Sequence, residues 1–385
     1  MQSAAAAAKI TPFLAMEVAE AAEALRREGH DVISFALGEP DFDTPACVRE
    51  AAERALRDGH THYTHSLGIV ELREAICEHY FSRYGVSLTP DRVMVTAGTS
   101  PALMLVFCAL LEPGDEVVLT NPCYACYPNF VRFANGEVVL VNTDAADGYQ
   151  LDVERVRAAL GPRTKAVLIN SPANPTGAVL GATSLKGLAD LGPTIVSDEI
   201  YHGLVYEGEE HTILEYTDRA IVLNGFSKLY AMTGWRLGYI IAPTDVIRRL
   251  QVLYQNFFIS AAAFVQWAAI AALREAGPDV ERMRQTYAER RRFMLAELGR
   301  LGFRIPSPPT GAFYVFANAR RFQKDSYRLA FDILEHAHVG VAPGIDFGEQ
   351  GEGYLRFSYA NNLENISEGL RRIRAAVGRY QAGVR

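Results

Sequence analysis

The chain has 385 residues, of which 49% are hydrophobic and 22% are charged, an ordinary composition for a globular protein. At roughly 150 residues per domain, this length suggests two or three domains. The net charge of -7 argues against a general attraction to nucleic acid or to anionic membranes, and five cysteines in a chain of this size exclude a small disulfide scaffold. Reduced thiols in the cytoplasm are the simplest interpretation.

The first 92 residues read mainly as helices. Amphipathic patterns predict helices over residues 15–27, 48–57 and 72–84, and a short strand over 32–37. The N-terminus has no basic or strongly apolar stretch typical of a signal peptide, and the longest apolar run, 102–111, is far below the roughly 20 residues that a membrane span needs.

From residue 93 onwards, short apolar runs alternate with longer helical patterns. The runs predict strands over 93–96, 116–119, 137–141, 166–170, 194–197, 221–224 and 237–241. Because these runs are apolar without strict alternation, they indicate strands buried on both faces of a mostly parallel sheet that is flanked by helices, an α/β fold. Ligands bind at the carboxyl ends of such strands.

The last hundred residues have a different texture. They predict an arginine-rich helix over 280–298, a strand over 312–316, a helix over 327–335, strands over 339–341 and 354–359, and a final helix over 366–380. This order is typical of a smaller α+β domain. We interpret the arginine-rich stretch 282–300, with its interspersed glutamates, as a solvated face.

Several reactive or phosphate-binding residue types follow the predicted strands. Ser227-Lys228 follows one strand, and a lysine in a pocket can lose its proton and attack a carbonyl. Asp198 closes another, where it could cap a helix or pair with a cationic ring nitrogen. Arg236 lies near two glycines and offers a fork for phosphate, and Gly98-Thr99-Ser100 joins a strand to a helix whose N–H groups can bind phosphate.

In this order, these stretches resemble the aspartate aminotransferase superfamily, the type I fold of pyridoxal-phosphate (PLP) enzymes, over nearly the whole chain. The most specific matches are Asn174-Pro175-Thr176-Gly177, Asp198-Glu199-Ile200-Tyr201, and Ser227-Lys228 through Arg236-Leu237-Gly238. The resemblance implies that PLP moves an amino group between an L-amino acid and a 2-oxo acid by a ping-pong mechanism. It implies a homodimer with shared active sites, and no nucleic-acid, membrane or metal partner.

The resemblance also implies a domain organisation and a set of site residues. An N-terminal arm and part of the small domain span 1–39, the large PLP-binding domain spans 40–278, and the C-terminal small domain spans 279–385. The catalytic residues are Lys228, which bonds to the cofactor and shuttles a proton, Asp198, which keeps the pyridine nitrogen protonated, and Tyr201, which with Asn174 hydrogen-bonds the phenolic oxygen. Tyr124 stacks on the ring.

The phosphate and the substrate have their own implied partners. Thr99, Ser100, Ser227 and Arg236 bind the phosphate, and Tyr63 reaches it from the neighbouring subunit. Arg356 grips the substrate α-carboxylate with help from Gly38 and Asn174.

Two positions depart from the family pattern. Gly225 stands where many relatives carry a serine that binds phosphate, so that one phosphate hydrogen bond is missing or supplied by water. Ser100 stands where relatives that prefer aspartate often carry a lysine, which weakens a dicarboxylate assignment and leaves alanine, aromatic and branched amino acids open. We interpret Tyr127 as a core aromatic, although Phe13, Leu14 and Tyr127 could also line an apolar side-chain pocket.

Three other functions remain as alternatives. A PLP-dependent carbon–sulfur β-lyase would use the same lysine and arginine, and would release pyruvate and ammonia from a cysteine conjugate without an added oxo acid. A non-enzymatic PLP-binding regulator would have a fused DNA-binding segment, which the chain lacks. A nicotinamide dehydrogenase would need a G-x-G-x-x-G turn after its first strand, and none is present.

Overall fold

A seven-stranded sheet forms the framework of the computed structural model, which describes residues 8–381. The strand order is β2-β8-β7-β6-β5-β3-β4. All neighbouring pairs are parallel except that β8 runs antiparallel to both β2 and β7. The strands are β2 (Val93–Thr96), β3 (Glu116–Asn121), β4 (Glu137–Asn142), β5 (Thr164–Asn170), β6 (Thr194–Asp198), β7 (Ile221–Gly225) and β8 (Gly238–Ile241). The predicted strands and the mostly parallel sheet are confirmed.

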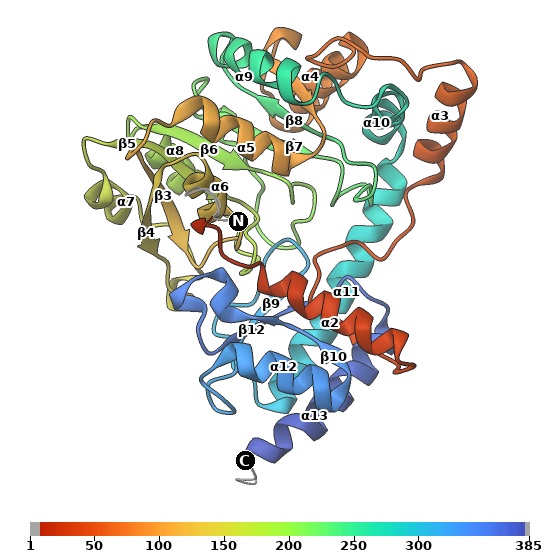
Figure 1. Ribbon diagram of the computed structural model, residues 1–385, viewed down its shortest axis with the longest axis vertical. Coiled ribbons are helices and arrows are strands. Elements are labelled where there is room, and N and C mark those ends of the chain that lie inside the picture. Colours follow the sequence, from red (N-terminus) through yellow and green to blue (C-terminus); the bar gives the residue numbers. More distant parts are fainter. Residues whose placement is uncertain (1–7, 382–385) are drawn as a thin grey trace.

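Both faces of this sheet are buried because its side chains alternate between two apolar cores. In β5, Val167 and Ile169 belong to one core, whereas Ala166 and Leu168 belong to the other. Helices cover the two faces (Figure 1). They are α3 (Ala46–Arg57), α4 (Val70–Tyr84), α5 (Thr99–Leu110), α6 (Tyr127–Phe133), α7 (Val153–Ala159), α8 (Ala182–Ala189), α9 (Thr244–Phe257) and α10 (Ala263–Glu275).

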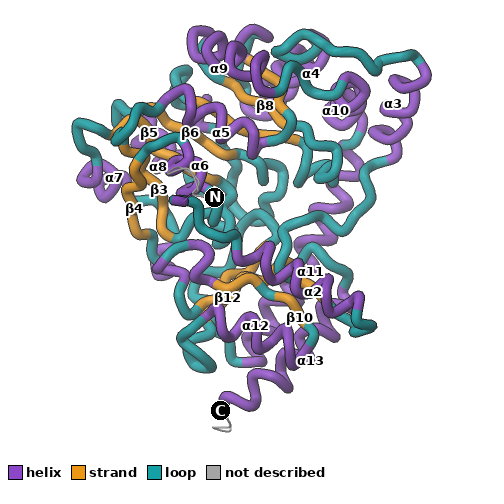
Figure 2. Tube along the Cα trace, in the orientation of Figure 1, coloured by secondary structure: helices purple, strands orange, loops and turns teal. Residues whose placement is uncertain are grey.

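The two ends of the described chain meet in a smaller α+β part. Strand β1 (Ile33–Ser34) pairs in parallel with β10 (Val339–Gly340), while β9 (Tyr314–Asn318), β12 (Tyr354–Ser358) and β11 (Ala342–Pro343) form an antiparallel sheet. Figure 2 shows β10 and β12 among α2 (Leu14–Arg27), α12 (Ser326–Ala337) and α13 (Leu363–Gln381). The prediction of a second, smaller α+β unit is therefore confirmed.

Helix α11 (Gly277–Leu301) runs between the two parts, and its inner face corrects one prediction. Arg290 and Arg291 are buried. Arg290 Nη1 lies 2.7 Å from Asp41 Oδ1, and Arg291 Nη2 lies 2.7 Å from Glu207 Oε1. The interpretation of 282–300 as a solvated face is wrong for these two residues, because they are buried and carboxylates from two other segments of the chain pair with their charges.

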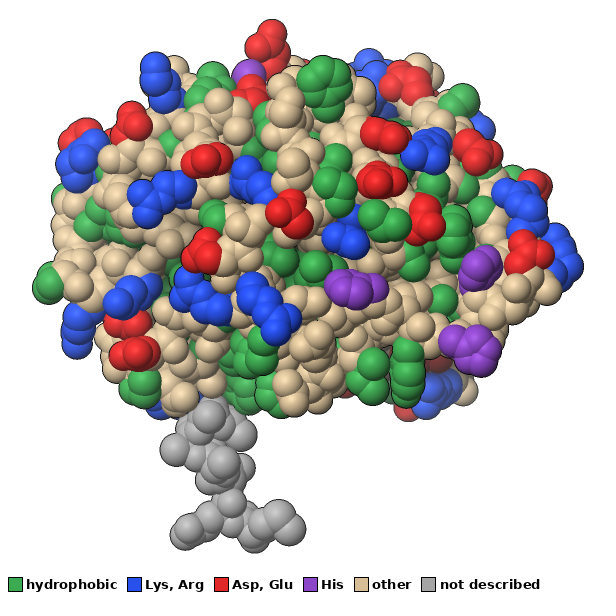
Figure 3. All heavy atoms as spheres, turned by 90° about the horizontal axis from the view of Figure 1, so that it is seen from above, with side chains coloured by type: hydrophobic (Ala, Val, Ile, Leu, Met, Phe, Trp, Pro, Cys, Tyr) green, Lys and Arg blue, Asp and Glu red, His purple; other side chains and the backbone are tan. Residues whose placement is uncertain are grey.

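One face of the molecule is of mixed charge. Basic and acidic side chains are interspersed on the face shown in Figure 3. Within residues 8–381, every helix is either too short or too polar to cross a bilayer. The same residues contain no group of three or more His, Cys, Asp or Glu side chains placed to hold a metal ion.

Candidate active site

A pocket of about 290 Å³ opens at the carboxyl ends of the parallel strands, where the fold predicts a ligand. Strands β5, β6 and β7 end there at Asn170, Asp198 and Gly225. Most of the site residues predicted from the sequence line this one pocket. They are Gly38, Thr99, Ser100, Tyr124, Asn174, Asp198, Tyr201, Ser227, Lys228, Arg236 and Arg356.

Lys228 presents its amine inside the pocket, three residues beyond the end of β7. Its Nζ donates a hydrogen bond to Gly38 O at 2.6 Å, and the lysine forms no ion pair within the described part of the chain. Burial lowers the pKa of Lys228 to about 8, because a buried ammonium loses hydration that its surroundings only partly replace. About a tenth of the amine is therefore neutral and nucleophilic at pH 7, far more than for a lysine with the ordinary pKa of 10.5.

Asp198 is the last residue of β6 and keeps only 4% of its surface exposed. Tyr127 Oη donates to its Oδ2 at 2.8 Å, and the backbone N–H of Ile200 donates to its Oδ1 at 3.1 Å. Burial nevertheless raises the pKa of Asp198 to about 6, since no cation pairs with it among residues 8–381. The carboxylate is thus prepared for a cationic partner that the described chain does not supply.

Arg236 and the start of α5 form an anion-binding corner. Gly98 adopts φ +102°, which a residue with a side chain rarely adopts, and a Cβ there would lie 2.8 Å from Arg236 Nη2. The arginine therefore packs directly against the backbone that leads to Thr99 and Ser100, whose N–H groups are in the first turn of a 12-residue helix. Backbone N–H groups and a guanidinium together suit a phosphate.

Gly225 has a packing reason of its own. A Cβ at this position would lie 3.0 Å from both Gly238 Cα and Leu237 O, where Gly225 of β7 pairs with Gly238 of β8. The glycine therefore allows the two strands to approach closely beside the anion-binding corner.

Arg356 on β12 is almost fully buried and faces the pocket from the smaller part of the fold. Its Nη1 donates to Asn174 Oδ1 at 2.9 Å, its Nη2 donates to Ala36 O, and its Nε has no partner within residues 8–381. The guanidinium lies 4.4 Å from the ring centroid of Tyr314 and 4.8 Å from that of Phe347. Such a buried, incompletely paired guanidinium can bind a carboxylate strongly.

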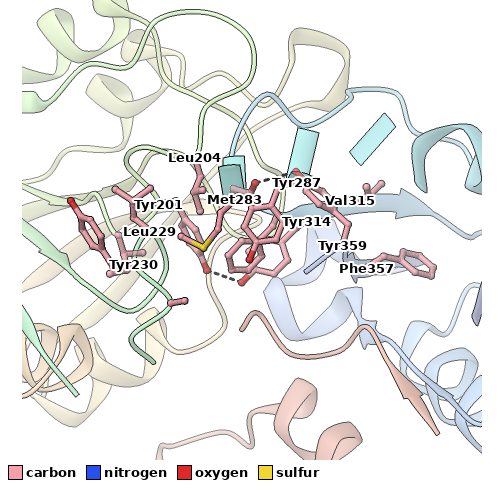
Figure 4. Packing of buried hydrophobic residues seen from close by; sticks show 14 of the residues in the cluster. Tyr201, Leu204, Leu229, Tyr230, Met283, Tyr287, Tyr314, Val315, Phe357 and Tyr359 are labelled. Atoms are coloured by element: carbon pink, nitrogen blue, oxygen red, sulfur yellow. Dashed lines mark hydrogen bonds between the residues drawn. The ribbon is translucent and has the colours of Figure 1, made fainter. Parts of the chain in front are cut away.

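Tyr201 and Tyr314 share a hydrogen bond of 2.7 Å between their hydroxyl groups, marked by a dashed line in Figure 4. The two rings pack nearly edge to face at 5.7 Å. A Cβ at Gly38 would lie 1.7 Å from Tyr314 Oη, so that only glycine leaves room for this pair. Burial raises the pKa of both tyrosines, which therefore act as neutral hydroxyl groups.

The structure places the remaining predicted residues unequally. Tyr124 lies in the pocket wall, with its ring 5.2 Å from that of Tyr127 at an interplanar angle of 84°. Phe13 also lines the pocket, whereas Leu14 does not. Tyr63 lies outside the pocket of its own chain and is 80% exposed.

Sequence reasoning missed several pocket residues. Tyr127 is buried as expected for a core aromatic and also lines the pocket, which the sequence had left open, but the hydrogen bond from its hydroxyl to Asp198 was not expected. Tyr314 was hidden within an apolar strand pattern. Glu39 lines the pocket and accepts a hydrogen bond from Thr233, and only its position after Gly38 could have drawn attention to it. Leu37, Leu103, Asn170 and Ile200 complete the wall.

Comparisons with known proteins agree with this geometry. A family model for aminotransferase class I and II matches residues 30–373. An aspartate/prephenate aminotransferase of Thermus thermophilus is 43% identical over 92% of this chain and 93% of that protein. A (5-formylfuran-3-yl)methyl phosphate transaminase of Methanocaldococcus jannaschii is 41% identical over 94% of this chain and 96% of that protein.

A solved structure extends the agreement to the fold. The aspartate aminotransferase of Thermus thermophilus with maleate matches with a TM-score of 0.94 and 41% identity, covering 98% of this chain and 100% of that one. The likeness thus includes both the large sheet and the smaller part. From its sequence, its fold and the residues gathered in its pocket, this chain belongs to the class I and II aminotransferases and is an enzyme that transfers amino groups.

Proposed function

We propose that the enzyme binds pyridoxal 5′-phosphate in the 290 Å³ pocket and transfers an amino group from an L-amino acid to a 2-oxo acid in a ping-pong reaction. When bound, this cofactor supplies an aldehyde that takes up the amino group and a ring that delocalises the electron pair left on the amino acid's α carbon. The observation that carries the proposal is that Lys228 and Asp198, both without an ion-pair partner in residues 8–381, line one pocket.

The residues present fit each part of that cofactor. The corner of Thr99, Ser100 and Arg236 suits the phosphate, with Ser227 beside it in the pocket wall. The Asp198 carboxylate suits a protonated ring nitrogen, because a nearby cation offsets the burial that raises its pKa. The remaining contacts are Tyr124 against the ring face, and Tyr201 and Asn174 toward the phenolic oxygen.

Two side chains act on the substrate. Lys228 Nζ would hold the cofactor by its aldehyde and, as a free amine, would remove the proton from the substrate's α carbon, a role that its lowered pKa favours. Arg356 binds the α-carboxylate with its unpartnered Nε and the remaining N–H groups of its guanidinium. Asn174, which accepts a hydrogen bond from Arg356, and the backbone at Gly38 help to bind the same carboxylate.

We further propose that the active enzyme is a homodimer in which Tyr63 of the partner subunit completes the phosphate site. The backbone next to Tyr63 bonds to the segment after α9, since Thr64 N donates to Ser260 Oγ at 3.3 Å. The last residue of α9, Phe257, is 67% exposed, and Ile259 in the following segment is 46% exposed. An apolar patch around an exposed tyrosine supports contact with a second copy of the chain.

The predicted domain boundaries also stay a proposal. Helix α11 begins at Gly277, next to the proposed boundary between 40–278 and 279–385, and β1 joins the segment 1–39 to the smaller part. Residues 1–7 of the proposed arm lie outside the described residues. All five cysteines are free, which supports a reducing compartment such as the cytoplasm.

Replacement of Lys228 by alanine tests the proposal. The variant should lose turnover but retain some PLP, which stays bound without a covalent link, whereas the exposed control Lys186→Ala should behave as wild type. Turnover is followed with a panel of amino acids and an oxo acid, and bound PLP by its visible absorbance. Full turnover in Lys228→Ala would refute the mechanism, and pyruvate and ammonia from a cysteine conjugate without an oxo acid would favour the β-lyase.

A further inference from the structure

The chain enters the pocket region through a short strap, residues 11–15, which includes the first two residues of α2. In Figure 1 this red segment passes from beside α6 to α2 on the smaller part of the fold. Its middle residue, Phe13, lines the pocket. The strap is therefore tied to both parts of the fold and forms part of the wall between them.

One end of the strap is clasped by Asn129 on α6. Thr11 N and Thr11 Oγ1 each donate to Asn129 Oδ1 at 3.1 Å, and Asn129 Nδ2 donates to Thr11 O at 3.0 Å. This amide satisfies the backbone N–H, the hydroxyl and the carbonyl of one residue at once. Because the bonds are exposed to water, the clasp fixes the position of the strap more than it stabilises the fold.

The other end is held by Asp346 of the smaller part. Its Oδ1 and Oδ2 accept from Leu14 N at 2.9 Å and from Ala15 N at 3.0 Å. Phe13 stands at the N-cap of α2, where its side chain cannot bond to the free N–H groups of the first turn. A carboxylate from a distant segment therefore caps the helix. This contact fixes the orientation of Phe13 at the start of the helix.

Between these two anchors, Phe13 forms an apolar wall beside the carboxylate-binding arginine. Its ring lies 5.9 Å from Tyr124 at an interplanar angle of 90°. It also packs against a buried cluster that contains Phe347, the residue whose ring lies 4.8 Å from the Arg356 guanidinium. A substrate held by its α-carboxylate at Arg356 thus has aromatic surface near its side chain.

The charges of the pocket point to the same class of substrate. Among the described residues that line it, Lys228, Arg236 and Arg356 are the cations. The proposed function uses all three, for the cofactor aldehyde, the phosphate and the α-carboxylate. A second carboxylate on a substrate would find no further cation in this wall, and its burial against Phe13 and Tyr124 would be unfavourable.

We infer that Phe13 is a specificity-determining residue that selects substrates with apolar, and especially aromatic, side chains. Thr11, Asn129 and Asp346 are the positioning residues that hold it over the site. The inference rests on the proposed function, because it needs the substrate α-carboxylate to bind at Arg356.

Binding of unreactive acids tests this selection without turnover. The probes are propanoate, 3-phenylpropanoate and succinate, which lack the amino group, titrated calorimetrically into the enzyme loaded with PLP. Wild type should bind 3-phenylpropanoate at least about 10-fold more tightly than succinate. Phe13→Ala should raise the Kd of 3-phenylpropanoate by about 10-fold and that of propanoate by less than about 2-fold, since only the longer acid reaches the ring.

Further variants separate selection from a purely structural effect. Phe13→Leu keeps an apolar side chain of similar volume and should raise the Kd of 3-phenylpropanoate by only about 3-fold. Asn129→Ala should shift discrimination in the same direction as Phe13→Ala, and the double variant should be no worse than Phe13→Ala alone because both act through one ring. Phe81→Ala, which removes an exposed aromatic on α4, should change nothing.

Three results would overturn the inference. They are equal losses for propanoate and 3-phenylpropanoate in the Phe13 variants, no loss for either, and wild-type binding of succinate as tight as that of 3-phenylpropanoate. These results differ from a failure of the proposed function, in which the protein would take up no PLP or would show no transamination with any amino acid. If Phe13→Ala does not fold, the ratio measured with Phe13→Leu decides.

Discussion

Replacement of Asp198 by asparagine should stabilise the apoenzyme, the protein without PLP, while it lowers activity by orders of magnitude. The carboxylate is 4% exposed and is hydrogen-bonded by Tyr127 and Ile200, but no cation pairs with it among residues 8–381. Burial is the largest cause that raises its pKa from 3.8 to about 6. Folding at neutral pH therefore carries an electrostatic cost that an amide of the same shape does not carry.

The size and direction of the effect follow from this shift. A difference of about 2 pKa units corresponds to about 3 kcal/mol. The cost is absent below the unfolded-state pKa near 4, grows as the pH rises toward the folded-state value of about 6, and is fully present above it. About half of this cost is present at pH 5 and nearly all of it at pH 7, so that wild type should lose about 1 kcal/mol relative to the variant over this interval.

Urea unfolding of both apoenzymes at pH 5, 6 and 7 measures this difference. One protein concentration is used throughout, because dimer formation would make stability depend on it. Asp58→Asn, at the exposed end of α3, controls for the loss of one negative charge. If the free energies of unfolding of wild type and Asp198→Asn stay parallel from pH 5 to pH 7, burial of this carboxylate does not carry the cost argued here.

Three other predictions use the same pocket. Because burial lowers the pKa of Lys228 to about 8, the rate of PLP uptake by the apoenzyme should rise about tenfold per pH unit below pH 8 and then level off. A rate that keeps rising tenfold per pH unit up to pH 10 would contradict this. Arg356→Lys keeps the charge but loses the fork, and should raise the KM for the amino acid by about 10- to 100-fold in steady-state kinetics, so an unchanged KM would exclude Arg356 from carboxylate binding. Tyr127→Phe removes a hydrogen-bond donor to Asp198 and should raise the pKa of that carboxyl further. As a result, kcat at pH 7 should fall by about 10-fold and the acid limb of the pH–rate profile should move to higher pH. An acid limb at the wild-type pH would assign Tyr127 a packing role only.

The central sheet could be predicted because its strands carry their information locally. In β7, Ile221, Val222 and Leu223 are all buried, and such a run has no polar face to confuse the pattern. The order of the strands could not be predicted in the same way. Strand β8 lies between β2 and β7 and runs antiparallel to both, although its apolar run resembles those of its parallel neighbours. An apolar run in the sequence indicates that a strand is buried, but it does not indicate which strand lies next to it.

Charged site residues were predictable, whereas an uncharged one within an apolar strand pattern was not. Lys228 and Arg356 are charged residues in apolar surroundings, which makes them conspicuous in the sequence. Tyr314 lies in a strand between Phe313 and Val315, and a buried tyrosine there looks the same whether or not its hydroxyl has a partner. The partner, Tyr201, is 113 residues away, so only the folded chain reveals the pair.

The pocket leaves three charged groups in conflict with their surroundings. Burial drives Lys228 and Asp198 toward their neutral forms, and Arg356 keeps an unpartnered Nε in an almost dry environment. An ordinary core would replace such groups with apolar ones, because an unpaired buried charge destabilises the fold. In the proposed function, one ligand with an aldehyde, a basic ring nitrogen and a phosphate would satisfy the first two groups, and the substrate α-carboxylate would satisfy the third. The groups that destabilise the chain without a ligand are therefore the ones proposed to bind cofactor and substrate, so Asp198→Asn should strengthen the fold and weaken the enzyme through the same carboxylate.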